Sequence, residues 1–133
     1  MRIATWNVNS IRTRLGQVME WLDEFSPDVL CLQETKVEDS LFPKENFIEN
    51  GYNIFFYGQK SYNGVALISK IPPEDVRMGF EGELDNYNSA KFLGNQKRVI
   101  SALINDIRIV NLYVPNGSDL SSEKYTYKLQ WLK

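Results

Sequence analysis

Polar side chains that can do chemistry gather in three short segments, each of which follows an apolar stretch. The segments are residues 7–12, 33–36 and 111–117. Sites on open α/β sheets form where strands end. A carboxylate beside carboxamides, as Glu34 would be beside Asn7, gives the oxygen ligands that Mg²⁺ prefers and leaves room for water and phosphate. The plainer alternative is that the asparagines make turn hydrogen bonds and that Glu34 is a solvated strand end.

The third segment, NLYVPNGS, places a tyrosine in an apolar strand. By strand alternation Asn111 and Tyr113 share one face of that strand. Polar groups in such a strand need partners, so Tyr113 is either a site residue or an amphipathic core tyrosine. Arg12, Lys60 and Tyr62 are candidate phosphate contacts, with ordinary surface positions as the alternative.

The sequence contains no histidine. Its absence excludes a Ser-His-Asp triad, a Cys-His pair, a histidine base and a His-ligated zinc within these residues. Catalysis here must use carboxylates, amides, tyrosines, lysines, arginines or a bound hard cation. The net charge is −2, yet residues 1–16 and 86–98 contain basic residues and no acidic ones. An acidic total is therefore compatible with a locally basic face that binds a polyanion.

The 133 residues, with seven Phe, seven Tyr and three Trp, are enough for one globular domain. The single cysteine, Cys31, allows no internal disulfide, suits a reducing compartment and is expected in the core. There is no apolar run of about 18 residues, so no membrane span is predicted. Residues 1–9 lack the apolar core of a secretion signal. We expect a cytoplasmic protein.

The elements that must position the first two segments form a strand–helix–strand unit. Residues 2–8 are β-rich and predict a buried strand. Ser10 is a good N-cap for a helix whose apolar stripe runs from Ile11 to Leu22 and which ends before Pro27. Residues 28–33 predict a second strand, parallel to the first with a right-handed crossover. Asn7 and Glu34 are then expected side by side.

The later residues predict further strands and two further helices. A short helix is expected at residues 43–50, closed by Gly51, and a tight turn at Asn105-Asp106. Strands are predicted at residues 52–58, 64–70, 76–80, 98–104 and 107–114, with a polar loop or hairpin at 81–96. A last helix is predicted from Ser121 or Ser122 to Lys133, without a C-cap.

Together these elements predict an α+β fold with a mixed, mostly antiparallel sheet and flanking helices. The strands are apolar on both faces, but the expected helices cover only one face of a sheet. The other face needs a second sheet, supplied by a larger protein or by a second chain.

Five motifs in order carry a resemblance to a known family: MRIATWNVNSIRTRL, DVLCLQETK, YNGVALISK, NQKRVISA and NLYVPNGS. The sequence resembles the exodeoxyribonuclease III type of apurinic/apyrimidinic endonuclease, in the endonuclease/exonuclease/phosphatase superfamily. The resemblance implies a four-layer α/β/β/α sandwich, of which residues 1–133 form the N-terminal half of a single domain. The C-terminal half of that domain would be absent.

The resemblance also implies roles for single residues. Glu34 matches the Mg²⁺ ligand of the family, and Asn7 matches an asparagine that supports the metal and the phosphate. Tyr113 matches the active-site tyrosine near the scissile phosphate. Asn9 falls where many relatives carry Asp, so a direct charge near the metal is missing. At Lys97 the family usually has Gly, so the shape of that turn is expected to differ.

Further residues are implied as DNA contacts. Arg12 matches a contact to backbone phosphate, and Tyr62 resembles a DNA-contacting tyrosine. Asn116 lies in the same loop as Tyr113, and Lys60 would help to position the backbone. Asn9 is a further candidate DNA contact.

The activity that the resemblance implies is Mg²⁺-dependent cleavage 5′ to abasic sites in duplex DNA, with Mn²⁺ as a second candidate ion. Action at 3′ ends, as exonuclease or phosphatase, is common in the family, and a bacterial member would be nucleoid-associated. The family also uses an Asp-x-Asn pair and an Asp–His pair from its second half, which have no match here. The 133 residues alone are therefore expected to be inactive or nearly so.

Two alternatives stay open. In the first, a second copy buries the open sheet face, which gives a homodimeric, non-catalytic binding or scaffold protein. In the second, the protein is a phosphatase or phosphodiesterase of the same superfamily that acts on a small substrate. The NVNSIR and YVPNGS motifs favour DNA repair over this last reading.

Overall fold

The structure is a computed structural model that describes residues 1–79, 97–115, 128–129 and 132. The loop or hairpin predicted at 81–96, the last helix predicted up to Lys133 and the candidate contact Asn116 lie, wholly or largely, outside the described residues. None of the described helices is long and apolar enough to cross a membrane.

The first sheet has the strand order β1-β2-β4-β3. Its strands are β1 (Ile3–Asn7), β2 (Val29–Gln33), β3 (Asn53–Tyr57) and β4 (Val65–Ser69). β1 pairs with β2 in parallel, as predicted, and the other pairs are antiparallel. The parallel register sets Asn7 opposite Gln33, so Glu34 follows directly after the partner of Asn7.

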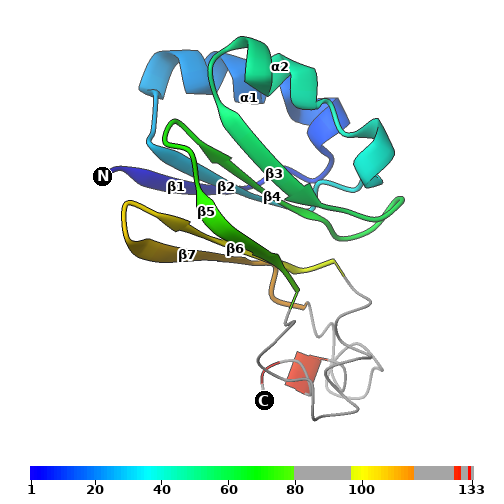
Figure 1. Cartoon of the computed structure of the whole chain (residues 1–133). Helices are drawn as coiled ribbons and strands as arrows, with labels where there is room; N and C mark the ends of the chain where they lie inside the picture. Colours follow the sequence, from blue (N-terminus) through cyan, green and yellow to red (C-terminus); the bar gives the residue numbers. More distant parts are fainter. Residues whose placement is uncertain (80–96, 116–127, 130–131, 133) are drawn as a thin grey trace.

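Helices cover one face of this sheet (Figure 1). They are α1 (Ile11–Phe25), α2 (Lys44–Glu49) and a short 3-10 helix, Asp39–Leu41, that no sequence pattern indicated. Ser10 caps α1 as predicted, because its hydroxyl oxygen accepts the backbone N–H of Thr13 at 3.3 Å. Gly51 closes α2 with a φ of 85° and donates its N–H to the Ile48 carbonyl. These contacts confirm two of the three predicted helices, the one after Ser10 and the one at residues 43–50.

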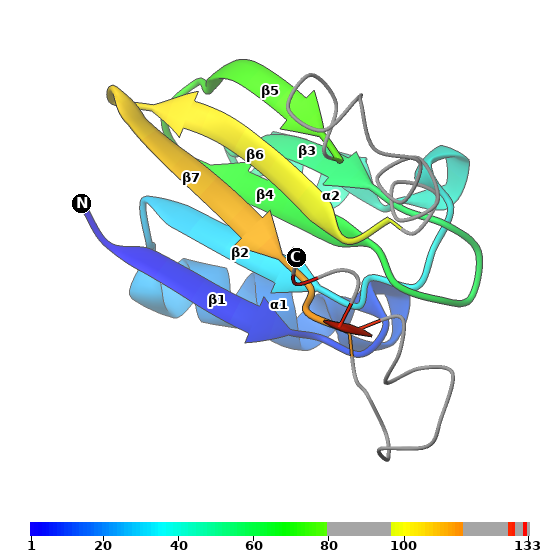
Figure 2. The same ribbon diagram turned by 90° about the horizontal axis from the view of Figure 1, so that it is seen from below.

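The second sheet consists of β5 (Glu74–Met78), β6 (Val99–Ile104) and β7 (Ile107–Leu112), all antiparallel. It lies on the face of the first sheet opposite the helices (Figures 1 and 2). Asn105 and Asp106 form the predicted tight turn, with φ of 50° and 63°. The α+β class is confirmed. The second sheet that the uncovered face was expected to need is present. Its expected source, a larger protein or a second chain, is wrong, because β5, β6 and β7 of this chain form it.

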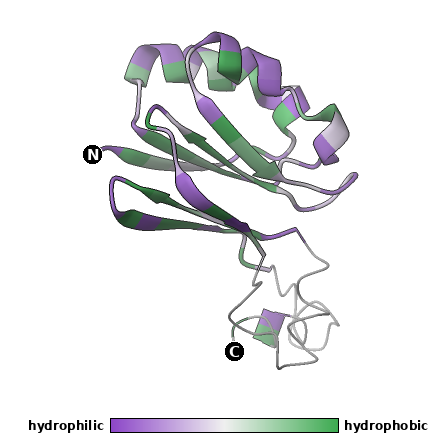
Figure 3. Ribbon diagram, in the orientation of Figure 1, coloured by the Kyte–Doolittle hydropathy of each residue, from purple (hydrophilic) through white to green (hydrophobic). Residues whose placement is uncertain are grey.

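Two apolar layers hold these elements together. One lies between the helices and the first sheet, where Phe42 stacks on Phe56 with ring centroids 4.3 Å apart. The other lies between the sheets and is built from β2, β4, β6 and β7. β2 and β4 are buried along their whole length because they contribute to both layers. Figure 3 shows the corresponding hydrophobic colour along the strands.

One flank of the sandwich is less covered. β7 lies over β2 and β4, and β1 extends beyond it (Figure 2). Ile3 pairs with Val29 of the inter-sheet layer, yet it is exposed. On the outer face of β7, Val110 is 51% and Leu112 is 42% exposed.

A test of this packing uses two glycines with positive φ. A Cβ at Gly64 would lie 2.1 Å from Oγ1 of the buried Thr35, whereas a Cβ at Gly51 would meet nothing within 4 Å. We expect Gly51→Ala to lower the free energy of unfolding by about 1–2 kcal/mol through its backbone conformation alone. Gly64→Ala should lose a further ~1–3 kcal/mol through overpacking. Urea unfolding measures both, and equal losses would contradict the described packing.

Candidate active site

The loops that carry the predicted residues meet at one end of the sandwich. The loop after β1 runs along the loop after β2, because the N–H groups of Val8, Ser10 and Ile11 donate to the carbonyls of residues 33–35. The loop after β2 continues the pattern, since the N–H groups of Thr35 and Lys36 donate to residues 63–64. The ends of three strands of the first sheet are thereby fixed to one another.

Backbone hydrogen bonds also join this end to the second sheet. Gly64 N–H donates to the Lys97 carbonyl at 2.8 Å, and Tyr113 N–H donates to the Arg98 carbonyl at 2.8 Å. β7 ends at Leu112, one residue before Tyr113, and not at the predicted residue 114. The Arg98 bond nevertheless holds the Tyr113 backbone beside the start of β6, within the second sheet.

Left-handed backbone conformations concentrate in these loops. Asn9, Ser10, Glu34 and Lys36 have φ of 45°, 89°, 55° and 55°. This region disfavours residues with a Cβ, and such strain clusters at functional sites, where the surrounding structure holds it in place. At Glu34 the left-handed turn ends the strand and directs the loop toward the start of α1.

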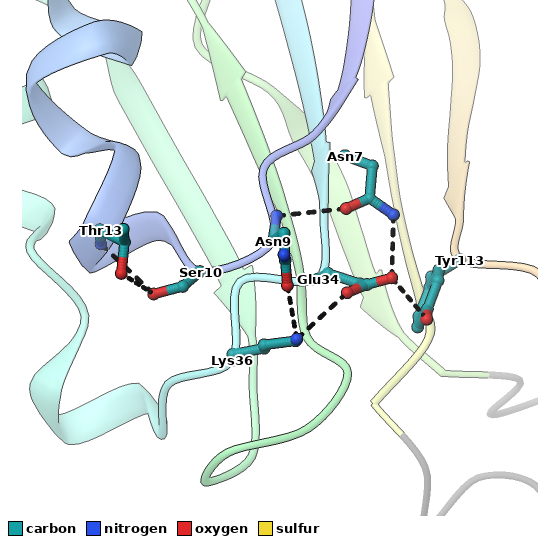
Figure 4. Close-up of polar contacts among 7 residues, drawn as sticks. All are labelled: Asn7, Asn9, Ser10, Thr13, Glu34, Lys36 and Tyr113. Carbon is teal, nitrogen blue, oxygen red and sulfur yellow. Dashed lines mark hydrogen bonds and ion pairs between the residues drawn. The ribbon is translucent and has the colours of Figure 1, made fainter.

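The Glu34 carboxylate is the centre of the cluster (Figure 4). Its Oε1 accepts a hydrogen bond from Tyr113 Oη at 2.7 Å and one from Asn7 Nδ2 at 3.1 Å. The ammonium of Lys36 lies 3.5 Å from Oε2. The three residues predicted to be catalytic, Asn7, Glu34 and Tyr113, are therefore in direct contact.

Asn9 joins the same cluster from its edge. Its N–H donates to Asn7 Oδ1 at 3.2 Å, and its own Oδ1 accepts from Lys36 Nζ (Figure 4). An uncharged amide here binds an ammonium that also approaches Glu34. Asn9 thus contacts the metal-site candidates directly, beyond the DNA contact assigned to it from sequence.

The remaining described candidates lie on two other elements near this end of the sheet. Arg12 is exposed on the first turn of α1, which begins directly after the β1 loop. Lys60 and Tyr62 are exposed on the loop between β3 and β4, and Tyr62 is 70% exposed. All three residues lie at the same end of the first sheet as Glu34.

Arg98 is a site residue that the sequence analysis missed. Its guanidinium carbon lies 4.6 Å from the centroid of the Tyr113 ring, and its Nη1 donates to the Tyr113 carbonyl at 3.2 Å. Its neighbour Lys97, where a different turn was expected, places its ammonium 4.0 Å from the centroid of the Tyr57 ring. A cation next to an apolar strand was the only sequence signal for Arg98.

The electrostatics assign a protonation state to the central pair. Partial burial raises the pKa of Glu34, but the hydrogen bonds from Tyr113 and Asn7 and the charge of Lys36 outweigh it, so the pKa lies below its ordinary value. Burial together with the hydrogen bond and charge of Glu34 raises the pKa of Tyr113 to about 12. At neutral pH the carboxylate is ionised and the phenol keeps its proton.

The donor set fits a weakly held hard cation. Among the described residues there is no group of three or more His, Cys, Asp or Glu side chains that could enclose a metal ion. Glu34 offers one ionised carboxylate whose Oε2 meets only the Lys36 ammonium within the described part of the chain. Mg²⁺ is commonly held by one or two carboxylates, water and substrate phosphate. Glu34 is thus suited to be one ligand of such an ion.

The lowered pKa of Glu34 leads to a pH-dependent prediction. Ionised Glu34 stabilises the fold above its unfolded pKa of about 4.3, and this contribution is lost as pH falls through the lower folded value. Tyr113→Phe removes one cause of the shift. We expect the variant to unfold at lower urea concentration than the wild type at neutral pH, with a difference that narrows below about pH 4.

Tyr52→Phe, at the far end of the first sheet, is the matched control. Its difference from the wild type should not change with pH. If the difference in unfolding between Tyr113→Phe and the wild type were also independent of pH, this would contradict the contact between Tyr113 and Glu34.

Comparison with known proteins gives a consistent picture. The sequence model of the Endonuclease/Exonuclease/phosphatase family matches residues 4–104. An exodeoxyribonuclease III from Haemophilus influenzae is 35% identical over 127 residues, which cover 92% of this chain and 45% of that protein.

Solved structures of related nucleases and phosphatases are also similar to this chain. An AP endonuclease from Archaeoglobus fulgidus superposes with a TM-score of 0.87 at 48% identity, covering 99% of this chain and 48% of that one. A variant of a 3′ phosphatase from Neisseria, bound to product DNA hairpin, gives 0.88 at 41% identity, with 98% and 48% covered. The chain spans 45% of the exodeoxyribonuclease III and 48% of each of these two solved structures. Its match over most of its residues shows that the chain belongs to the Endonuclease/Exonuclease/phosphatase family.

Proposed function

We propose that these residues are the metal-binding and phosphate-positioning half of a Mg²⁺-dependent DNA-repair nuclease. Its reaction would be cleavage of the phosphodiester 5′ to abasic sites in duplex DNA, with exonuclease or phosphatase action at 3′ ends and Mn²⁺ as the alternative ion. The observation that carries the proposal is the ionised Glu34 carboxylate, bound by Asn7 and Tyr113 where strands of both sheets end. The names of the relatives, an exodeoxyribonuclease, an AP endonuclease and a 3′ phosphatase, support it.

The chemistry divides among these groups. Phosphodiester hydrolysis needs charge neutralisation on the non-bridging oxygens, an activated water and stabilisation of the leaving oxygen, and a bound Mg²⁺ supplies Lewis-acid character to the phosphate. Glu34 would hold the ion, and Asn7 orients Glu34 through its amide. Tyr113 keeps its proton at neutral pH and donates it to Glu34 Oε1 in this structure. To donate to a phosphate oxygen, the hydroxyl would have to turn from Glu34 to the substrate.

The exposed residues around the cluster suit a DNA backbone. Arg12 and Lys60 would contact phosphates, which positions the duplex without reading its sequence. Tyr62 offers an exposed aromatic ring, and Asn9 lies at the edge of the metal-site candidates. Asn116 is proposed as a further DNA contact from its sequence position beside Tyr113. Such a protein would act in the cytoplasm, at the nucleoid in a bacterium.

The catalytic base and the group that orients the attacking water are proposed to come from a complementing C-terminal half. The chain has no histidine and spans 45% of the length of the exodeoxyribonuclease III that it matches. Groups that act as a unit lose several powers of ten in rate when part of the unit is missing. The exposed Ile3 flank and the outer face of β7 are apolar surfaces that such a half could cover.

The two alternatives receive less support. The sheet face proposed for a second copy is covered by β5, β6 and β7 of the same chain. Arg12 lies on the first turn of α1, and Lys60 and Tyr62 lie on the loop between β3 and β4. A small phosphate substrate does not require candidate contacts on two separate elements, whereas a polymeric phosphate backbone does.

The incision test uses a duplex with one abasic site in the presence of Mg²⁺. The 133 residues alone should give no measurable cleavage. Fusion to the second half of the Archaeoglobus relative should give cleavage that Glu34→Gln reduces by about 100-fold or more, because a metal ligand is lost. Glu45→Gln, which removes an exposed carboxylate on α2, should have no effect. Fast cleavage by the unfused chain, or a fusion indifferent to Glu34→Gln, would refute the proposal.

Binding of the same duplex tests the basic contacts. Each phosphate contact makes affinity more dependent on salt, so Arg12→Gln should weaken binding and reduce the slope of log K against log salt by about 1. Lys70→Gln, at the opposite end of the first sheet, should leave the slope unchanged. Fluorescence anisotropy over a salt series measures the duplex affinity of both variants and its dependence on salt. Identical slopes for the wild type and Arg12→Gln would show that Arg12 meets no phosphate.

A further inference from the structure

Two buried amide side chains join the sheets beside the proposed site. Asn111 on β7 is 2% exposed and Gln33 on β2 is also buried. Asn111 Oδ1 accepts a hydrogen bond from Gln33 Nε2 at 2.7 Å. Asn111 Nδ2 donates to the Leu32 carbonyl at 2.9 Å and to the Ala66 carbonyl at 2.8 Å. Both protons of the Asn111 amide are thus used, within an otherwise apolar layer.

Gln33 extends this network to the edge strand. Its Nε2 also donates to Thr5 Oγ1 on β1 at 2.8 Å. The two amides therefore link β1, β2 and β4 of the first sheet to β7 of the second. Strands β1, β2 and β7 are the ones whose ends supply the proposed catalytic residues.

The network lies directly behind the functional residues. Gln33 precedes Glu34 in the chain, and Asn111 precedes Tyr113 by two residues. The hydrogen bond of 2.7 Å between Tyr113 and Glu34 requires that the sheets keep one separation and one register. Apolar contact between sheets is not directional and fixes the register poorly. Hydrogen bonds between buried groups have defined geometry and are costly to leave unmade.

We propose that Asn111 and Gln33 are positioning residues that hold Tyr113 and Glu34 in register and so set the affinity of the site for a divalent cation. The metal part of this inference rests on the proposed function. Groups that orient metal ligands through hydrogen bonds change metal affinity by about 10–100-fold when they are mutated. Neither residue needs to touch substrate.

The test measures Mn²⁺ binding to the full chain by the electron paramagnetic resonance signal of free Mn²⁺. Asn111→Leu replaces the amide by an apolar group of similar size and should weaken Mn²⁺ binding by about 10-fold or more. Ile109→Ala is the matched control, since Ile109 is buried in the same layer, two residues farther from the site on the same strand. It should lower stability without a change in Mn²⁺ affinity. If both variants lost the same Mn²⁺ affinity, the network would contribute only general packing, and the proposal would be overturned.

A second readout and a second variant keep the test decisive. The ¹³Cζ resonance of Tyr113, assigned with Tyr113→Phe, reports the hydrogen bond to Glu34. It should shift in Asn111→Leu and stay in place in Ile109→Ala. Gln33→Met keeps the two Asn111 bonds to backbone carbonyls and replaces Asn111→Leu in the test if that variant does not fold. It should also shift the Tyr113 resonance and weaken Mn²⁺ binding.

The outcomes separate the two claims. A wild type that binds no Mn²⁺ would refute the metal part of the proposed function, and the tyrosine resonance would then decide the positioning claim alone. A wild type that binds Mn²⁺, with unchanged affinity and an unchanged resonance in Asn111→Leu and Gln33→Met, would overturn the positioning claim and leave the proposed function standing.

Discussion

One hydrogen bond between two sheets organises the site: Tyr113 Oη donates to Glu34 Oε1 at 2.7 Å. The two residues are 79 positions apart in the chain, and they meet only because β7 lies over β2. The contact selects an ionised carboxylate and a protonated phenol, since each partner shifts the pKa of the other away from neutrality. Everything that fixes the spacing of the sheets therefore also fixes the chemical state of the pair.

Two kinds of interaction fix the distance between the sheets. The apolar layer between the sheets provides most of the burial, through residues such as Val65, Leu67 and Ile100. Backbone hydrogen bonds then tie the loop after β1 to the loop after β2 and, through Gly64 and Lys97, to the second sheet. Stability and site geometry thus have partly separate sources, which is why a loss of packing can be distinguished experimentally from a loss of register.

The local elements could be predicted from sequence because they follow from periodicity and caps. The stripe from Ile11 to Leu22 with Ser10 before it gave the helix, and the apolar segment 28–33 gave the parallel strand. The division of strands between two sheets could not be predicted. The residue pattern of a strand that is apolar on both faces does not indicate which other strands pair with it or pack on it. Arg98 was missed for a similar reason: its role depends on the Tyr113 ring, which only the tertiary structure brings close.

A double-mutant cycle on Glu34 and Tyr113 tests the central claim most directly. The free energy of unfolding is measured for the wild type, Glu34→Gln, Tyr113→Phe and the double variant. Residues in direct contact typically show a coupling of about 0.5–3 kcal/mol, and we predict a favourable coupling in this range at neutral pH. Additive effects, with no coupling beyond error, would contradict an assembled site in which the two sheets bring these side chains together.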